Sequence, residues 1–176
     1  MAGRSEDEFS NVACITVTES AANTLTYKKL EAGISITDKV AWLISRIEYH
    51  TLTSLAGAFN ADGAQLHVGM SVYNGLTTQQ SVGSIADPSM IDRVWLEEVY
   101  FGAAASGFLF QRPLIHDFSD LPGGGIIVPP TPIYGWAQGN ALTVATDTVI
   151  RFHYTLLKLG TEQYWQLVEA RRVIAS

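Results

Sequence analysis

The chain has 176 residues, a formal net charge of -6 at pH 7, 47% apolar residues and only 16% charged residues. This length fits one domain whose core needs no disulfides, and the single cysteine, Cys14, excludes both a disulfide framework and a zinc site made of thiolates. The acidic balance argues against a nucleic-acid-binding domain. Because no run of about 18 apolar residues and no signal-peptide pattern occurs, we expect neither a membrane span nor a secretory leader.

The low content of charged residues suggests that part of the surface is buried against other copies of the chain. Freely soluble monomers usually have about a quarter of their residues charged, whereas this chain has 16% and a positive mean hydropathy. A compact monomer that is rich in Gly and Ala and has neutral polar loops is the alternative explanation.

The first third of the chain predicts a polar arm followed by three strands. Residues 1–11, MAGRSEDEFSN, are acidic and show no periodicity, so we expect a flexible N-terminal arm. Alternation rich in Thr, Val, Ile and Tyr predicts strands over 13–19 and 24–30, joined by a turn at 20–23. Segment 34–50 is apolar on both faces, and a helix there would lack a clean apolar stripe, so we expect a strand buried on both faces.

The middle of the chain predicts further strands, separated by turns. Segment 64–73 alternates clearly. Segment 88–99 fits either a helix or a strand, and its strand neighbours favour a strand. Strands at 108–118, where Pro113 indicates an edge or a bulge, at 126–128 and at 133–136 follow, and Gly139-Asn140 predicts a turn into the last strand.

The last strand, over 148–158, is expected to have one apolar face and one mixed face that carries Arg151 and His153. Gly160 ends this strand, and Thr161 is placed to cap a following helix. Glu162 at the start of the helix, and basic residues at its end, have the charges that the helix dipole favours. Because so short a helix is unstable alone, it must dock on its own subunit or on a neighbour. The apolar face of the strand consists of Ile150, Phe152, Tyr154 and Leu156, and the helix residues expected to dock are Tyr164, Trp165 or Leu167.

These elements predict an all-β fold, with a single jelly-roll barrel or sandwich of about eight strands and a short C-terminal helix. We expect a flexible arm over residues 1–11, a jelly-roll domain over 12–159, and a C-terminal helix and tail over 160–176.

No pattern in the sequence indicates catalysis. Segment 69–73, GMSVY, lacks the second Gly of a nucleophile elbow, and no Lys follows the Gly run at 123–125 as a phosphate loop requires. We expect Cys14 to be a small core residue. Carboxylates at 92, 97, 98, 117 and 120 could serve glycoside hydrolysis or calcium binding between subunits, but we expect solvated loop charges instead.

Four histidines lie apart in the sequence, on or at the ends of four predicted strands, so a metal site would require several of them to meet inside a barrel. We therefore predict no catalytic residue, no metal and no cofactor. The four are His50, His67, His116 and His153.

Aromatic and basic residues near the C-terminal third are the candidates for an interaction surface. Tyr134 and Trp136 lie in a segment bounded by Pro and Gly, where an exposed Trp136 could stack on a sugar or fill a contact between subunits. The candidate interface residues are Trp136, Tyr134, Tyr164, Trp165, Arg171 and Arg172.

The strand-rich body, the extended stretch IIVPPTPIYGW, the final strand TVIRFHYTLLKL and the closing GTEQYWQLVEARRVIAS resemble the single jelly-roll major capsid proteins of small icosahedral viruses of archaea and bacteria. The resemblance implies a structural protein, not an enzyme, that self-assembles in the host cell into an icosahedral virion shell enclosing the genome. Its partners would be copies of itself, with or without a second capsid protein.

The N-terminal arm departs from the basic arm that many such proteins use to neutralise their genome. Arg4 is followed by Glu6, Asp7 and Glu8, so we do not expect direct nucleic-acid binding by the arm. Another protein or a membrane layer would then hold the genome, or the shell would fill without an arm. The alternatives are a lectin-like carbohydrate-binding sandwich using Trp136 or Trp95, a non-viral cage subunit, and an enzyme with a histidine metal site.

Overall fold

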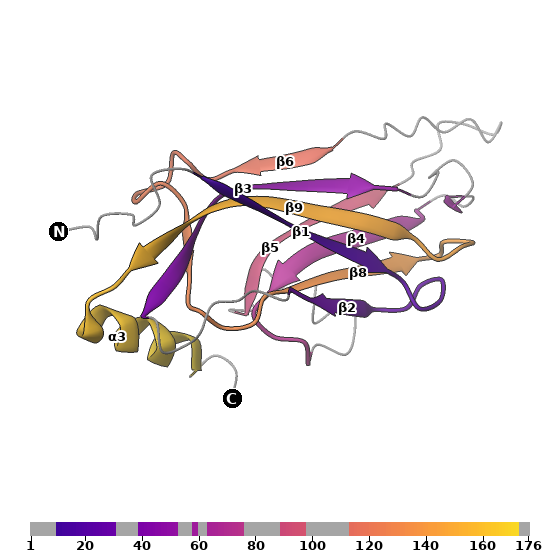
Figure 1. Ribbon diagram of the computed structural model, residues 1–176. Coiled ribbons are helices and arrows are strands. Elements are labelled where there is room, and N and C mark those ends of the chain that lie inside the picture. The colour runs from indigo at the N-terminus through magenta and orange to yellow at the C-terminus, as the bar shows by residue number, and fades with distance from the viewer. Residues whose placement is uncertain are drawn as a thin grey trace.

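The computed structural model describes residues 10–30, 39–52, 58–59, 63–75, 89–97 and 113–172. Within these ranges the strands form two antiparallel sheets that face each other (Figure 1). Sheet 1 contains, in spatial order, β1 (Asn11–Thr18), β9 (Asp147–Lys158), β3 (Val40–Thr51) and β6 (Leu114–Asp117), and β7 (Ile126–Val128) also pairs with β3. Sheet 2 contains β2 (Thr26–Lys29), β8 (Tyr134–Asn140), β4 (Gln65–Ser71) and β5 (Met90–Glu97).

β6 and β7 are two halves of one interrupted strand. Both run antiparallel to β3, β6 beside residues 46–49 and β7 beside residues 42–44, and residues 118–125 loop out between them. At the same level, the register between β3 and β9 shifts between Ile44 and Arg46, and the carbonyl of Ser45 accepts a hydrogen bond from the Phe118 N–H at 2.7 Å. With the halves counted as one, each sheet has four strands.

The chain crosses between the sheets after β1, β2, β3, β5, β7 and β8, so the edge strands β1, β2 and β6 pair with strands distant in sequence. β1 lies beside β9, and β2 lies beside β8. This wrapped, antiparallel arrangement of two four-stranded sheets is a jelly roll. The predicted all-β jelly roll with a short C-terminal helix, α3 (Thr161–Arg172), is therefore confirmed.

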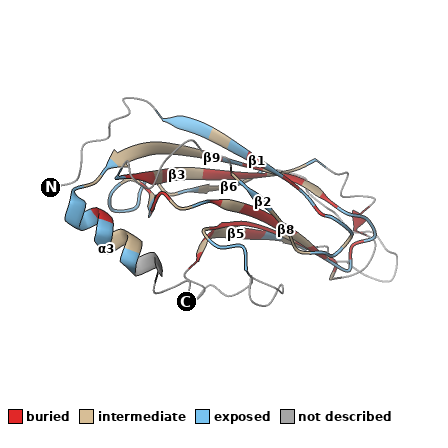
Figure 2. Cartoon of the chain, turned by 60° about the horizontal axis from the view of Figure 1, so that its bottom comes forward, coloured by how far each residue is buried: buried red, intermediate tan, exposed pale blue. Residues whose placement is uncertain are grey.

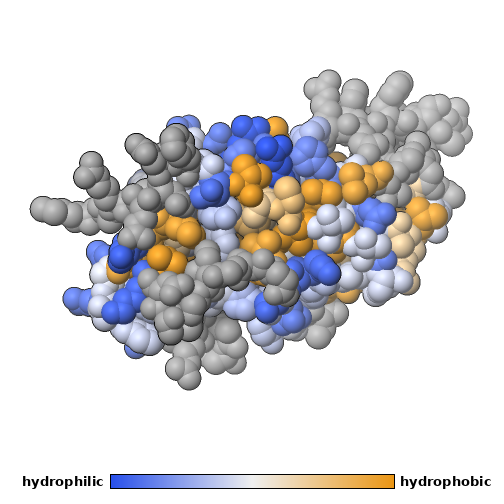
Figure 3. Space-filling model, viewed as in Figure 1, coloured by the Kyte–Doolittle hydropathy of each residue, from blue (hydrophilic) through white to orange (hydrophobic). Residues whose placement is uncertain are grey.

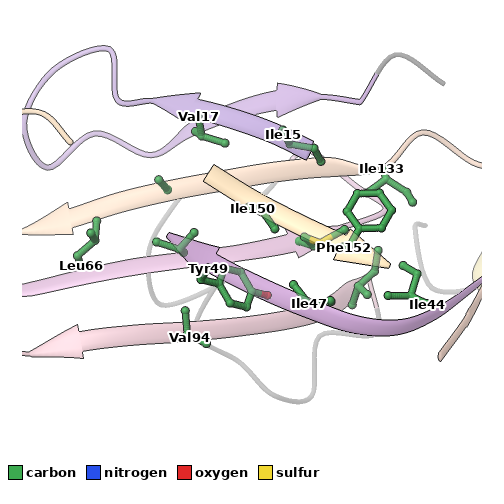
Figure 4. Close-up of a cluster of buried hydrophobic side chains, with 14 of the residues drawn as sticks. Ile15, Val17, Ile44, Ile47, Tyr49, Leu66, Val94, Ile133, Ile150 and Phe152 are labelled. Atoms are coloured by element: carbon green, nitrogen blue, oxygen red, sulfur yellow. The ribbon is translucent and has the colours of Figure 1, made fainter. Parts of the chain in front are cut away.

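The core lies between the two sheets, where the side chains that the alternation assigned to one face meet (Figure 4). On the last strand the expected apolar face is confirmed, because Ile150 and Phe152 are fully buried, whereas Arg151 points outward and is exposed. Each buried aliphatic or aromatic side chain of this kind stabilises the fold by roughly 1.5–3 kcal/mol. The core side chains labelled in Figure 4 are Ile15, Val17, Ile44, Ile47, Tyr49, Leu66, Val94, Ile133, Ile150 and Phe152.

The difficult segments 34–50 and 88–99 contain strands, as predicted, and β3 is buried on both faces over much of its length. The predicted turn at Gly139-Asn140 is wrong, because both residues end β8 and the chain turns only at Ala141, whose φ is 57°. Residues 1–9 of the arm predicted over 1–11, and the first part of the strand predicted at 108–118, lie outside the described residues, and Asn11 already belongs to β1.

A buried carboxylate explains why the turn after β8 has this shape. Glu19 is 3% exposed and accepts hydrogen bonds from the backbone N–H of Gly139 (2.7 Å), the N–H of Thr146 (2.9 Å) and the Thr146 hydroxyl (2.7 Å). Asn23, in the turn before β2, exchanges two hydrogen bonds with the backbone of Leu142. The polar groups of the β1–β2 and β8–β9 connections thus satisfy one another at this end of the sandwich.

Candidate assembly surfaces

The C-terminal helix docks on its own subunit through Tyr164. This side chain is 1% exposed, whereas its neighbour Trp165 is 54% exposed, with the two ring centroids 5.5 Å apart. At the start of the helix, Lys39 Nζ donates to Thr161 Oγ1 at 3.1 Å, which links the helix to the beginning of β3. Thr161 is the first helical residue, so Gly160 occupies the capping position assigned to Thr161, and the side chain of Gln163 accepts the Gly160 N–H at 3.4 Å.

Helix α3 lies at one end of the sandwich, and most of its described length is not buried (Figures 1 and 2). It buries Tyr164 and leaves Trp165 exposed. Leu167 is intermediate in exposure. Arg171 and Arg172 end the helix, as predicted, but their side chains lie outside the part that the structure describes. An exposed tryptophan held on a docked helix can insert into a neighbouring surface with little loss of conformational entropy.

Trp136 has a different position from the one that its sequence context suggested. It lies on the outer face of sheet 2, opposite Gly69 of β4, and it is 0% exposed. Its ring occupies the space above Gly69, where an added Cβ would lie 2.3 Å from the indole. The expectation of an exposed Trp136 is wrong, and this side chain cannot stack on a sugar without local unfolding.

Tyr134 lies on the same outer face and is half-buried. Its ring packs edge-on against Tyr27 of β2, with the centroids 6.5 Å apart. The outer face of sheet 2 is thus partly aromatic at β2 and β8. Tyr134 forms part of its accessible surface, and Trp136 is a buried residue of the same face.

Trp95 is the exposed tryptophan of sheet 2. It lies on the edge strand β5 and is 53% exposed, and the Arg93 guanidinium lies 5.4 Å from its ring centroid. A pocket of about 290 Å³ lies along β5 beside these residues, lined in part by Met90, Ile91 and Asp92. An aromatic ring and a cation beside a hollow can hold a ring-shaped polar ligand.

A charged cluster occupies the outer face of sheet 1, around Glu48. Its carboxylate, with a side chain 10% exposed, lies 3.0 Å from Arg46 Nε, 3.4 Å from His50 Nε2, 3.4 Å from His153 Nε2 and 3.9 Å from Arg151 Nη1. Burial alone would raise the pKa of Glu48, but the hydrogen bond from His50 and the nearby positive charges outweigh it and lower the pKa. Glu48 is therefore held ionised, which links β3 to β9 on the outside.

A second polar cluster joins the two sheets at their open edge. Asp92 of β5 accepts a hydrogen bond from the Tyr49 hydroxyl at 2.9 Å and contacts His116 Nδ1 of β6 at 2.8 Å. Burial, followed by the charge and the hydrogen bond of Asp92, raises the pKa of Tyr49 well above its ordinary value. These contacts join β5 of sheet 2 to β3 and β6 of sheet 1.

The remaining candidate groups are dispersed. Cys14 is exposed on the outward face of β1, so the prediction that it is a core residue is wrong. His67 contacts Gln65 at 3.0 Å, and burial, assisted by Arg93, lowers its pKa. Hydrogen bonds from Ser119 lower the pKa of Asp117.

In the ranges that the structure covers, no group of three or more His, Cys, Asp or Glu side chains is arranged to hold a metal ion. The described helices also include none with the length and apolar content needed to cross a bilayer.

Sequence reasoning did not find the clusters around Glu48 and Asp92. For the cluster around Glu48, local signals existed, because Arg46, Glu48 and His50 alternate along β3, and Arg151 and His153 alternate along β9. The pairing that joins these two sets, and the contacts of Asp92 with Tyr49 and His116, link residues far apart in the chain.

Comparison with known proteins identifies no family but does identify the fold. No protein-family profile matches the sequence, and no curated protein matches it. Merkel cell polyomavirus VP1, solved as an unassembled pentamer, matches with a TM-score of 0.54 at 6% identity, over 91% of this chain and 99% of that chain. VP1 of trichodysplasia spinulosa-associated polyomavirus matches with a TM-score of 0.47 at 10% identity, over 90% and 97%. A chain of tomato aspermy virus matches with a TM-score of 0.47 at 10% identity, over 86% and 79%. The similarity to Merkel cell polyomavirus VP1 shows that this chain shares the jelly-roll fold of a viral capsid protein.

Proposed function

We propose that this protein is a structural capsid subunit that self-assembles into an icosahedral virion shell enclosing a genome, and that it has no catalytic role. The observation that carries the proposal is the topology: two four-stranded antiparallel sheets in jelly-roll order, matching Merkel cell polyomavirus VP1 over 91% of the chain. The low charge content supports it, because faces with few charges are suited to contacts between copies. The closing segment favours the single jelly-roll type found in viruses of archaea and bacteria.

In this proposal the jelly roll, over residues 12–159, forms the body of the shell, and the segment 160–176 contributes a contact with a neighbouring subunit. Trp165 is the central residue of that contact, because it is 54% exposed while Tyr164 fixes the helix to the barrel. Tyr134, Arg171 and Arg172 contribute to the contact surface, and the buried Trp136, on the outer face of sheet 2, supports it. Repeated head-to-tail contacts of this kind close into rings and shells.

The proposed partners are copies of the same chain, with a second capsid protein as a possible addition to the shell. The acidic arm gives no electrostatic support for genome binding, so we assign genome contact to another protein, to a membrane layer or to passive filling. The proposed location is the virion, after assembly in the host cell.

Electron microscopy of the purified full chain tests the proposal. We expect uniform closed particles from the wild type and mostly unassembled subunits from Trp165→Ala. Tyr73→Ala is a matched control, since Tyr73 is also a surface aromatic residue, 41% exposed, and should leave particles intact. Full-size particles from Trp165→Ala would show that the helix is not a clamp, and the absence of particles from the wild type under all assembly conditions would overturn the capsid role.

A second candidate function, carbohydrate binding, is favoured by the pocket along β5. It combines an exposed Trp95 with a stacked Arg93 and a hollow of about 290 Å³. A glycan screen monitored by tryptophan fluorescence tests this candidate. Binding that Trp95→Ala removes and Trp165→Ala leaves unchanged would support it, whereas a fluorescence response that survives Trp95→Ala would exclude this pocket.

A further inference from the structure

Strand β1 is an edge strand without the usual protection against pairing. Among the described residues it pairs with β9 alone, and its register runs without a bulge from Asn11 to Thr18. Its sequence, NVACITVT, contains no charged residue and no proline. Figure 2 shows it at the margin of the molecule with much of its length exposed. Monomeric proteins usually guard such an edge with charge, proline, bulges or short length, because an open edge is a template for another strand.

The other edge strands of the described sheets are guarded. At the opposite edge of sheet 1, β6 has four residues, follows Pro113 and ends at Asp117, and the loop over 118–125 interrupts it. In sheet 2, β2 has four residues, two of which are lysines. The other edge, β5, carries Asp92, Arg93 and Glu97 and has a register shift against β4. Among the described edge strands, β1 alone lacks charge, proline, a bulge and an interruption, so its edge is suited to pairing with another strand.

We infer that β1 pairs antiparallel with β1 of a second copy, which joins the two copies of sheet 1 into one continuous sheet across a two-fold axis. The occupant follows from charge: two uncharged β1 strands bring no like charges opposite each other, whereas the guarded edge at β6 cannot form an uninterrupted ladder with β1. The outward side chains Val12, Cys14 and Thr16 then form one small, mostly apolar row with their symmetry mates. This inference rests on the proposed function and specifies one of its subunit contacts.

In Figure 3, which has the viewpoint of Figure 1, apolar residues run along the middle of the face where β1 and β9 cross, and charged residues flank them. Antiparallel self-pairing extends this apolar strip into the neighbouring copy. The charged cluster around Glu48 begins one strand from the edge, because Arg151 and His153 of β9 lie opposite Cys14 and Val12 of β1.

Cys14 gives a direct test, because it is the single cysteine of the chain and it is exposed near the middle of β1. A self-pairing centred on Ile15 sets Cys14 opposite Thr16 of the second copy, so the two thiols lie on a diagonal about 7–8 Å apart, within reach of a short bismaleimide. We expect the wild-type full chain to give a covalent dimer. The matched control Cys14→Ser/Ser119→Cys moves the thiol to the opposite edge of sheet 1 and should not dimerise.

Two further measurements sharpen the test. Thr16→Lys on the wild-type background should lower the cross-linked yield by at least about fivefold, since the two added charges then lie on the neighbouring diagonal across the axis, whereas Ser119→Lys should not. Cross-linking between wild type and the position-119 variant in a mixture would instead show head-to-tail pairing and overturn the inference. Particles without a Cys14-linked dimer would also overturn it while the capsid role stands, and dimers without particles would support the pairing and contradict the shell.

Discussion

Trp136 and Trp165 were both candidates for a subunit contact, and the structure separates them. Trp136 fills the space above Gly69 on the outer face of sheet 2 and is 0% exposed, whereas Trp165 lies on a docked helix and is 54% exposed. Trp136 stabilises the fold of the subunit, whereas Trp165 is accessible on the surface for contact with another subunit. The comparison teaches that an aromatic residue near Pro and Gly indicates close packing, without saying whether the packing is within a subunit or between subunits.

The largest expected effect is on the stability of the subunit after truncation of Trp136. Trp136→Ala should lower the free energy of unfolding by about 3–5 kcal/mol, because it leaves a cavity in a fully buried site. Trp165→Ala should change it by less than about 1 kcal/mol, since the side chain is half solvated. Denaturant unfolding of dissociated subunits measures both. Equal losses for the two variants would contradict the division between them.

The packing of Trp136 on Gly69 predicts the next effect. Gly69→Ala places a Cβ 2.3 Å from the indole and 2.7 Å from the Asp92 carbonyl oxygen, so it should cost about 1–3 kcal/mol of stability. The double variant Gly69→Ala/Trp136→Phe makes room at the ring and should be destabilised by less than the sum of the two single changes. Full additivity in this double-mutant cycle would show that the two residues do not share one packing site.

The link between the sheets predicts a smaller loss. Asp92→Asn removes the carboxylate that contacts Tyr49 and His116, and it should lower the free energy of unfolding by about 1–3 kcal/mol. Particles formed by this variant should have the wild-type diameter, because the cluster lies between the sheets of one subunit. A changed particle size at unchanged subunit stability would place Asp92 among the groups that make contacts between copies.

The smallest effect is expected from Glu48, and it depends on pH. The pKa of Glu48 is lowered in the folded state, so its contribution is fully present above the ordinary value of 4.5 and is lost as the pH falls through the folded value. Glu48→Gln should therefore cost roughly 1 kcal/mol near neutral pH and flatten the decline in stability below pH 4.5. Thermal unfolding between neutral and acidic pH measures this. An unchanged pH profile would show that the four basic neighbours do not stabilise the charge.

The fold was largely predictable, because strand alternation reports which side chains share a face. On β1 it correctly separates Ala13, Ile15 and Val17 from the outward set that includes Cys14. It cannot say which face another layer covers, and for this reason Cys14 was placed in the core and Trp136 at the surface. The end of β8 was also missed, since Gly139 stays in the strand to donate its N–H to the buried Glu19.

The candidate surfaces were predictable only in part. The helix residues were found because the end of the last strand and the charges of the following turn are local signals. In the cluster around Glu48, the spacing of Arg46, Glu48 and His50 is a local signal. The contacts to His153, and those of Asp92 with Tyr49 and His116, depend on strands distant in sequence.

The mass of the purified full chain in solution, measured by light scattering at near-neutral pH and modest salt, tests the capsid proposal most directly. A uniform particle containing many copies, closed when seen in electron micrographs, is the predicted result. A monodisperse species with the 19.1 kDa mass of a single subunit, persisting at every concentration and salt tested, would contradict it.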